Sequence, residues 1–300
     1  MRPQRVYLIK GFNVPDITDD DRFAYLQSFV LYQAVGFYRD EQHRHTAQTF
    51  HSAAIQMLRQ LDLVGMINKA VVRSADGLVG PELNQAWKDW VKIETRRRVA
   101  AITYLLDLEF ATYFKVEPKL AFSELDIGLP SAEVLWKANT PAEWQHVQAS
   151  PIIPPNIHFL TAVRALLAID HSNPFSADNL LLSELGRLDA FPLLILTRTL
   201  TFLQAKAEDA LAKADPFRSM LGGLMQNQQE SSAEAELLRK IRRGKDYLRS
   251  LPGGIQRGSG EGWFEEALPT ASVGKPPAES AVMTPELLKA VCRLSFGSFS

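Results

Sequence analysis

The pattern of hydrophobic and polar positions is helical along most of the chain. It is clearest over residues 86–114, where apolar and aromatic residues recur at steps of three and four, as on one face of an α-helix. The same periodicity predicts further helices at residues 22–37, 42–64, 157–169, 177–188, 191–214 and 234–251. No run of alternating residues is strong enough to predict a sheet. The pattern therefore predicts an all-α fold, an irregular multi-helix bundle.

Proline and glycine divide the chain into segments. Residues 1–19 are rich in Pro, Gly and Asp and are expected to form an N-terminal connector before an α-helical domain at 20–251. Residues 252–283, rich in Gly, Pro and Ser, predict a flexible linker, and 284–300 a short C-terminal helix. Within the domain, prolines forbid a long helix over 117–148, yet its many apolar residues predict an ordered crossing segment that packs on the core.

The long helix at 86–114 carries charged residues on its apolar face. Glu94 precedes Arg97 and Arg98 by three and four residues, a spacing at which an acid and a base on a helix can pair. Asp107 falls on the neighbouring flank. Because an isolated buried charge is very costly, we expect a paired polar network inside the helical core.

Composition limits the functions that the chain can perform unaided. It has 33 basic and 34 acidic residues and a formal charge of −1, so it lacks the positive field of a self-sufficient nucleic-acid binder. Its single cysteine, Cys292, excludes a disulfide framework and a zinc site built on several thiolates. No apolar run approaches the roughly 18 residues of a membrane span, so no membrane partner is expected.

Several polar clusters have a functional and a structural interpretation. His43, His45 and His51 suggest a metal site, but residues two apart on a helix face different ways, so an exposed polar turn is favoured and no metal is expected. The acidic run 19–21 is interpreted as a helix start. A basic run suits nuclear import or DNA-backbone contact, although a solvated helix face is favoured; its main residues are Arg239, Lys240, Arg242 and Arg243.

A larger signature combines several of these features. It consists, in order along the chain, of two tryptophans, a Glu followed by an arginine cluster, an aliphatic run ending in Asp, a Ser-Glu-Leu to Leu-Pro segment and two later tryptophans. The positions concerned are Trp87, Trp90, Glu94, Arg97, Arg98, Asp107, Glu124, Pro130, Trp136 and Trp144. This succession resembles the regulatory middle homology region of fungal transcription factors, also described as the xylanolytic activator type.

The resemblance implies an all-α regulatory domain that senses an effector or dimerises and that acts in DNA-templated transcription in the nucleus. It implies partners among the transcriptional machinery or co-regulators, a second copy in a homodimer, or a small-molecule effector. It also implies an upstream zinc-dependent DNA-binding module, either a six-cysteine cluster or two-Cys two-His fingers. With one cysteine, this chain holds neither. Zinc and DNA contact are therefore expected only through that other module, and this chain has no cofactor of its own.

The expected effector pocket lies where the long helix meets the crossing segment, between Trp90, Tyr104, Trp136 and Trp144, because concave aromatic-lined sites are preferred ligand positions. No nucleophile with a matched base, phosphate loop or hydrolase elbow is found, so no enzyme activity is expected. The alternative is an α-helical small-molecule-binding protein or enzyme that uses an internal cavity lined by the charged face.

Overall fold

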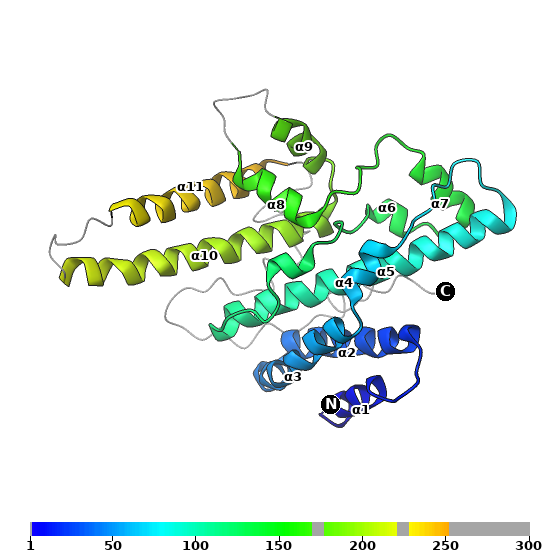
Figure 1. Ribbon diagram of the computed structural model, residues 1–300, viewed down its shortest axis with the longest axis horizontal. Coiled ribbons are helices and arrows are strands. Elements are labelled where there is room, and N and C mark those ends of the chain that lie inside the picture. The colour runs from blue at the N-terminus through cyan, green and yellow to red at the C-terminus, as the bar shows by residue number, and fades with distance from the viewer. Residues whose placement is uncertain (1, 170–176, 221–227, 252–300) are drawn as a thin grey trace. The chain divides into compact units, whose positions relative to one another are not determined.

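The computed structural model describes residues 2–169, 177–220 and 228–251, and within them it contains helices and no strand (Figure 1). The all-α prediction is therefore confirmed for this part of the chain. The linker and C-terminal helix expected at 252–300 lie outside the described residues.

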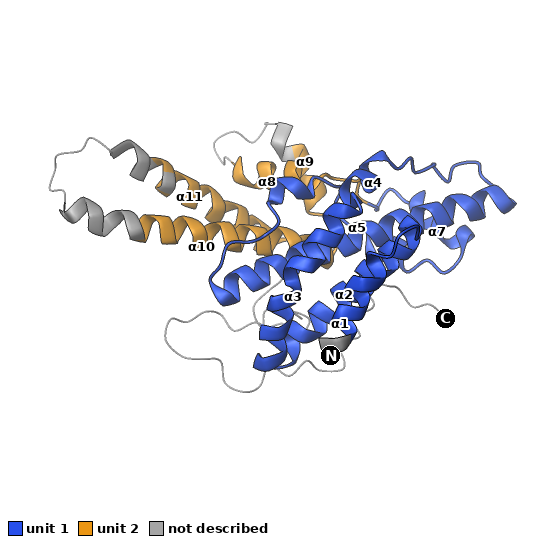
Figure 2. Ribbon diagram, turned by 60° about the horizontal axis from the view of Figure 1, so that its bottom comes forward, with its two compact units in different colours: residues 1–153, 256–300 blue, residues 154–255 orange. Residues whose placement is uncertain are grey.

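The chain divides into two compact units, which differ from the single domain expected at 20–251. The described residues up to 153 belong to unit 1, and those from 154 belong to unit 2 (Figure 2). The boundary falls in a stretch with Pro151, Pro154 and Pro155. Proline lacks a backbone N–H and restricts the residue before it, so no helix continues through this stretch to join the two units.

Unit 1 begins with α1 (Arg2–Phe12), where the sequence analysis expected a connector. This expectation is wrong because α1 docks on α2 through its side chains. Phe12 is buried, and the guanidinium of Arg5 fits beside Gly36, where a Cβ atom would lie only 2.5 Å from Arg5 Nη2. The proline and glycine content of residues 1–19 gave the wrong prediction because Gly11 is itself helical and packs against Tyr25.

The next three helices follow the predicted positions with one difference. α2 (Asp19–Arg39) starts at Thr18, whose Oγ1 accepts from the Asp21 N–H, and the acidic run lies in its first turn as expected. α3 (Glu41–Gln60) and α4 (Leu63–Lys69) replace the single helix predicted at 42–64. The break occurs at Asp62, which adopts φ of +47° and caps α4 by accepting from the Gly65 N–H.

Helix α5 (Gly80–Phe114) is 35 residues long and is the central element of unit 1. It contacts α2, α3 and α4 along its length. Between Val99 and Ala111 every residue of α5 is buried. A helix that is covered on all sides lies at the centre of its domain, which explains why its charged residues must find partners inside the protein.

The crossing segment (residues 117–148) returns along α5 in the opposite direction. It contains the short helices η1 (Phe122–Leu125), α6 (Glu133–Trp136) and α7 (Pro141–Gln148), of which η1 and α7 contact α5. Thr140 caps α7 by accepting from the Glu143 N–H, and Pro141 lies in the first turn, where its missing N–H is not needed.

Unit 2 consists of α8 (Phe159–Leu167), α9 (Ala177–Leu185), α10 (Ala190–Met220) and α11 (Gln228–Ser250). Helices α10 and α11 pack along each other, and α8 packs on α11. Gly244 allows this second contact, since a Cβ atom there would lie 2.9 Å from the Leu166 carbonyl oxygen. None of the described helices is long and apolar enough to cross a lipid bilayer.

Candidate functional site

The first feature of the site is a buried carboxylate on α5 that holds the crossing segment. Glu94 is fully buried and accepts from Arg97 Nη1 at 2.6 Å and from Arg98 Nε at 2.9 Å. Its two oxygens also accept from the backbone N–H of Ser131 at 2.8 Å and from its hydroxyl at 2.9 Å. Both ion pairs that the spacing predicts are present. Four donors satisfy the carboxylate, so its burial is compensated. We call this set the Glu94 junction.

Arg98 extends the junction toward the aromatic residues. Its Nη2 donates to the Ser131 carbonyl oxygen at 2.9 Å, and its guanidinium carbon lies 4.5 Å from the ring centre of Trp136. Burial lowers the pKa of the Arg98 guanidinium, and the adjacent Glu94 carboxylate opposes this shift. Arginine stays protonated in proteins, so Arg98 brings a positive charge into the core and uses it to hold both the backbone and an aromatic face.

A second buried carboxylate holds the other end of the crossing segment. Asp107 Oδ1 accepts from His51 Nε2 at 2.7 Å, and Oδ2 accepts from the backbone N–H of Leu120 at 2.7 Å. Asp107 and His51 are both buried. The interpretation of His51 as part of an exposed polar turn is therefore wrong, whereas His45 is exposed and His43 is partly so.

The apolar pattern of α3 could have indicated that His51 is buried. It occupies the same helical stripe as Ala47, Ala54 and Leu58, all of which are buried. Its partner Asp107 lies on another helix, and no sequence spacing connects the two. The contact between His51 and Asp107 can be recognised only in the three-dimensional structure.

The four tryptophans of the described chain gather near the start of α5. Trp90 and Trp144 are buried with ring centres 5.7 Å apart, and Trp136 lies 6.4 Å from Trp90. Trp87 packs against the same group. We call Trp87, Trp90, Trp136 and Trp144 the tryptophan cluster.

The structure does not bring Tyr104 to the tryptophan cluster. Tyr104 is buried, but it lies about four helical turns beyond Trp90, roughly 20 Å along α5. The pocket expected among Trp90, Tyr104, Trp136 and Trp144 therefore joins residues that the helix keeps apart. The reason is that a shared helix face says nothing about distance along the axis.

An irregular segment before α5 covers the tryptophan cluster. Ala75 and Leu78 pack against the cluster, and two glutamines of α7 hold their backbone. Gln145 Nε2 donates to the carbonyl oxygens of Ala75 and Leu78, at 2.7 and 3.0 Å, and the Ala75 N–H donates to Gln148 Oε1 at 3.1 Å. We call residues 70–79 the strap.

With this arrangement established, comparison with known proteins gives the family. A family model described as "Fungal specific transcription factor domain" matches residues 5–243. The chain belongs to this family. The match covers α1 from Arg5 onward as well as most of unit 2, so both units form part of the fungal transcription factor domain.

Curated relatives are also fungal transcription factors. The chain is 30% identical over 125 residues to the nicotinate catabolism cluster-specific transcription factor of Emericella nidulans, a match of 41% of this chain and 14% of that protein. It is 26% identical over 111 residues to transcription factor PfmaH of Pestalotiopsis fici, covering 32% and 12%. It is 26% identical over 137 residues to zinc finger protein klf1 of Schizosaccharomyces pombe, covering 45% and 16%.

The chain therefore spans about one seventh of the length of these relatives. No solved structure matches it. Family membership thus establishes a role in transcription regulation. What the longer relatives bind and control is a property of those proteins and is not carried over to this chain.

The described part of this fungal transcription factor domain does not fit a zinc site. None of its His, Cys, Asp and Glu side chains form a group of three that could hold a metal ion. Cys292 lies outside the described residues.

Two signature residues serve the crossing segment in other ways. Glu124 lies at the surface and accepts from Arg59 Nε and Nη2, both at 2.9 Å, while Pro130 is buried directly before Ser131. The hydrogen bonds from Arg59 hold the pKa of the Glu124 carboxyl below its usual value, and the pKa of Arg59 is correspondingly raised. This surface pair fixes η1 to α3.

The basic run lies on an exposed face of α11. Arg239 pairs with Glu236 at 2.9 Å and Arg242 with Glu208 of α10 at 3.4 Å. Lys240 is exposed, and Arg243 is partly exposed. Two of the four cations therefore have acidic partners, as on an ordinary solvated helix face.

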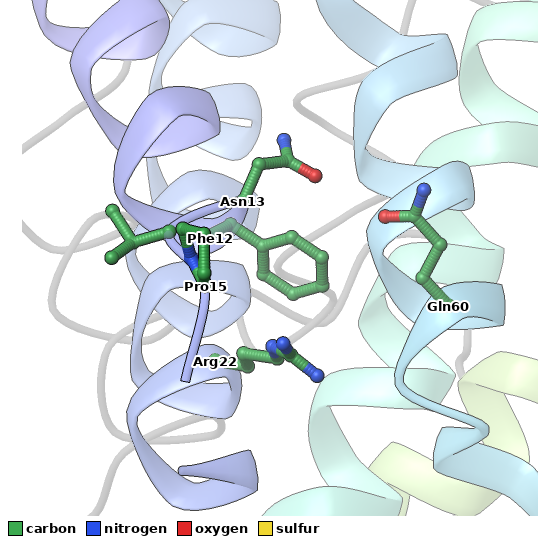
Figure 3. Close-up of a pocket in the computed structure, with 6 residues that line it drawn as sticks. Phe12, Asn13, Pro15, Arg22 and Gln60 are labelled. Atoms are coloured by element: carbon green, nitrogen blue, oxygen red, sulfur yellow. The ribbon is translucent and has the colours of Figure 1, made fainter. Parts of the chain in front are cut away.

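A surface hollow lies elsewhere in unit 1, where no site was predicted. Its volume is about 220 Å³, and it lies between the end of α1, the start of α2 and the end of α3. In Figure 3, Phe12, Asn13 and Arg22 point toward Gln60 of α3. Arg22 Nη1 lies 3.8 Å from Asp19 Oδ1, so the charge of Arg22 is partly compensated.

Proposed function

We propose that this fungal transcription factor domain senses an effector, and that binding at α5 and the crossing segment controls transcription. The observation that supports this proposal is how the crossing segment is held. Two buried carboxylates of one helix, Glu94 and Asp107, fix its backbone at Ser131 and Leu120. Irregular backbone fixed by a few buried polar contacts can exchange between discrete arrangements, and an effector that binds one arrangement better shifts the population.

In this proposal, the transcriptional machinery or a co-regulator reads the arrangement of the crossing segment. A ligand that prefers one arrangement by about 1.4 kcal/mol changes the ratio of the two tenfold, which is within the usual range of allosteric coupling. Homodimerisation is the other role that the family resemblance suggests, and sedimentation of the purified chain measures it.

DNA recognition comes from outside these 300 residues in the proposed mechanism. Its support is the composition: one cysteine cannot build a thiolate zinc module, and the net charge of −1 gives no positive field. One relative is named zinc finger protein klf1, which agrees with this division of roles. Purified residues 1–300 should therefore not bind DNA sequence-specifically.

The proposed place of action is the nucleus. Neutralising Arg239, Lys240, Arg242 and Arg243 to glutamine should leave a fluorescent fusion where the unmodified fusion is found, because this face is solvated and partly paired. Movement of the label from nucleus to cytoplasm would instead assign nuclear import to this face.

The deciding experiment tethers residues 1–300 to a foreign DNA-binding module upstream of a reporter gene. We expect reporter output to differ from that of the module alone, and to change in Ser131→Ala, which removes the hydroxyl donor to Glu94 while keeping its backbone N–H. The matched control is Ser183→Ala in α9, which removes an exposed hydroxyl. Reporter output equal to that of the module alone, at equal protein level, would overturn the proposal, and so would turnover of a metabolite by the purified chain. Sedimentation of the same chain reports dimerisation.

A further inference from the structure

The tryptophan cluster contains two hydrogen-bond donors that lack an acceptor. The indole Nε1 atoms of Trp87 and Trp144 are both buried, and neither has a hydrogen-bond partner. Trp144 is fully buried as a residue. Native proteins pair the large majority of buried polar atoms, because a buried donor without an acceptor loses its hydration and gains nothing in return. Two such donors in one cluster therefore require an explanation.

The surroundings of these donors resemble the wall of a ligand site. Indole rings of the cluster present flat apolar faces, and Ala75, Leu83 and Leu135 add apolar contacts. Such surfaces suit a flat apolar molecule, and the two indole N–H groups are the kind of sparse polar groups that orient a ligand in an apolar site.

The strap is the part of the wall that can open. No residue between Ala70 and Val79 is helical, and inside the strap one backbone turn bond runs from the Leu78 N–H to the Ala75 carbonyl oxygen. Its side-chain contacts to α7 come from Gln145 and Gln148. Val71 and Val79 are exposed, at 84% and 74%, so they do not hold the strap to the protein. Release of a few hydrogen bonds would lift Ala75 and Leu78 from the rings, whereas moving α5 would disrupt the whole core.

We propose that the tryptophan cluster binds a flat, largely apolar small molecule that carries a hydrogen-bond acceptor oxygen, and that the strap is the gate of this site. The acceptor receives the indole N–H group of Trp87 or of Trp144. This inference rests on the proposed function, because it names the site and the chemical class of the effector. Carbonyl and carboxylate oxygens share the required chemistry, and the experiment distinguishes them.

The test follows the indole N–H signals of the ¹⁵N-labelled 300-residue chain by NMR. The five tryptophans are assigned by single Trp→Phe changes. The probes are benzamide, benzoate and toluene, which present a similar ring with a neutral acceptor, a charged acceptor and no acceptor. We expect the signals of Trp87 and Trp144 to move with one or both acceptor probes in a saturable way, and to respond less to toluene.

Two outcomes would overturn the proposal. One is that no probe moves these two signals more than the backbone signals of α11. The other is a persistent cross-peak between either indole proton and a buried water molecule, since water would then already supply the acceptor. If benzamide moves the signals and benzoate does not, the acceptor is a carbonyl; the reverse result assigns a carboxylate.

Variants separate the donors from the gate. Trp87→Phe keeps an aromatic ring and removes one N–H, so it should weaken the acceptor probe by roughly three- to tenfold while changing toluene less. Gln145→Ala removes two strap contacts and should speed probe association without removing a donor. Gln85→Ala, which loses only an exposed contact to Asp89, is the matched control and should leave both unchanged. Equal losses for benzamide and toluene in Trp87→Phe would count against the donor role.

The outcomes also separate this inference from the proposed function. Binding at the indoles with no change of the tethered reporter would keep the site and refute effector sensing. A reporter that responds to Ser131→Ala while no probe moves the indole signals would keep regulation and refute this site.

Discussion

Two buried arginines of unit 1, Arg98 in α5 and Arg5 in α1, are held in contrasting ways. Both are at most 1% exposed, and burial lowers the pKa of both guanidinium groups. Arg98 pairs with the Glu94 carboxylate. Arg5 donates to Gln33 Oε1 and to the Tyr32 carbonyl oxygen, both at 2.9 Å, while its Nη1 is buried without a partner.

The two contacts should therefore differ in how much they stabilise the fold, with the Glu94 junction contributing more than the contacts of Arg5. In the Glu94 junction, removing the acid would take away the carboxylate that pairs with two arginines of α5, and the N–H and hydroxyl of Ser131 would lose their acceptor. The charge of Arg5 is also desolvated, but only neutral groups accept its hydrogen bonds. Docking of α1 therefore offsets less of the desolvation cost than the ion pairs of Arg98 do. We therefore expect α1 to open at lower free energy than α5.

The largest expected effect is that of Glu94→Ala. Removing one partner of a buried ion pair should lower the free energy of unfolding by about 3–5 kcal/mol. Chemical denaturation monitored by tryptophan fluorescence measures it. Lys137→Ala, which breaks an exposed pair with Glu133, is the control and should lose at most about 0.5 kcal/mol. An unchanged midpoint in Glu94→Ala would contradict the role of the junction.

Asp107→Asn should rank second. The amide keeps the shape of the side chain but loses the charge that accepts from His51 and Leu120, which should cost about 2 kcal/mol. A double-mutant cycle with His51→Gln measures the coupling, and we expect a coupling energy of at least about 0.5 kcal/mol. Strict additivity of the two changes would mean that the side chains do not act as a pair.

Arg5→Met tests the other side of the comparison. The change removes an unpaired buried charge, which should largely offset the loss of two hydrogen bonds of about 1 kcal/mol each. The free energy of unfolding should therefore change by no more than about 1 kcal/mol. Hydrogen exchange of the α1 amides reports the docking directly. A loss as large as that of Glu94→Ala would show that Arg5 is as firmly compensated as Arg98.

The smallest effect is expected at the exposed Arg59–Glu124 pair. Because the folded pKa of Glu124 lies below its ordinary value of 4.5, its contribution to stability is present above that pH and is lost as the pH falls through the lowered pKa. The difference between the parent chain and Glu124→Gln should thus be small at pH 7 and vanish in acid. Thermal melts across this range measure it, and a difference that grows in acid would reverse the assigned sign.

The sequence predicts what is local and misses what is tertiary. Pairing of Glu94 with Arg97 and Arg98 follows from one helical turn, and the cap at Thr140 follows from the chemistry of a helix start. The His51–Asp107 contact joins two helices that are far apart in sequence, and no spacing encodes it.

Errors in the prediction also have physical causes. The connector expected at 1–19 contains α1 because the fit of Arg5 beside Gly36 is a tertiary property. The strap escaped notice because its contacts are made by glutamine side chains to backbone carbonyl groups, which leave no hydrophobic pattern. Asp62 ended a predicted helix early because a left-handed residue interrupts the hydrogen bonding without changing the apolar stripe.

The spacing of the two carboxylates along α5 sets a rule for changes in chain length. Glu94 and Asp107 lie roughly 20 Å apart on a stiff rod, whereas the chain from Leu120 to Ser131 can reach nearly twice that distance when extended. The crossing segment therefore has slack between its two attachment points, and residues added near Phe122 can bulge outward. One residue inserted into α5 between the carboxylates would turn one of them by about 100° from its attachment point. Insertions are thus tolerable in the crossing segment between its two attachment points and disruptive in α5 between the two carboxylates.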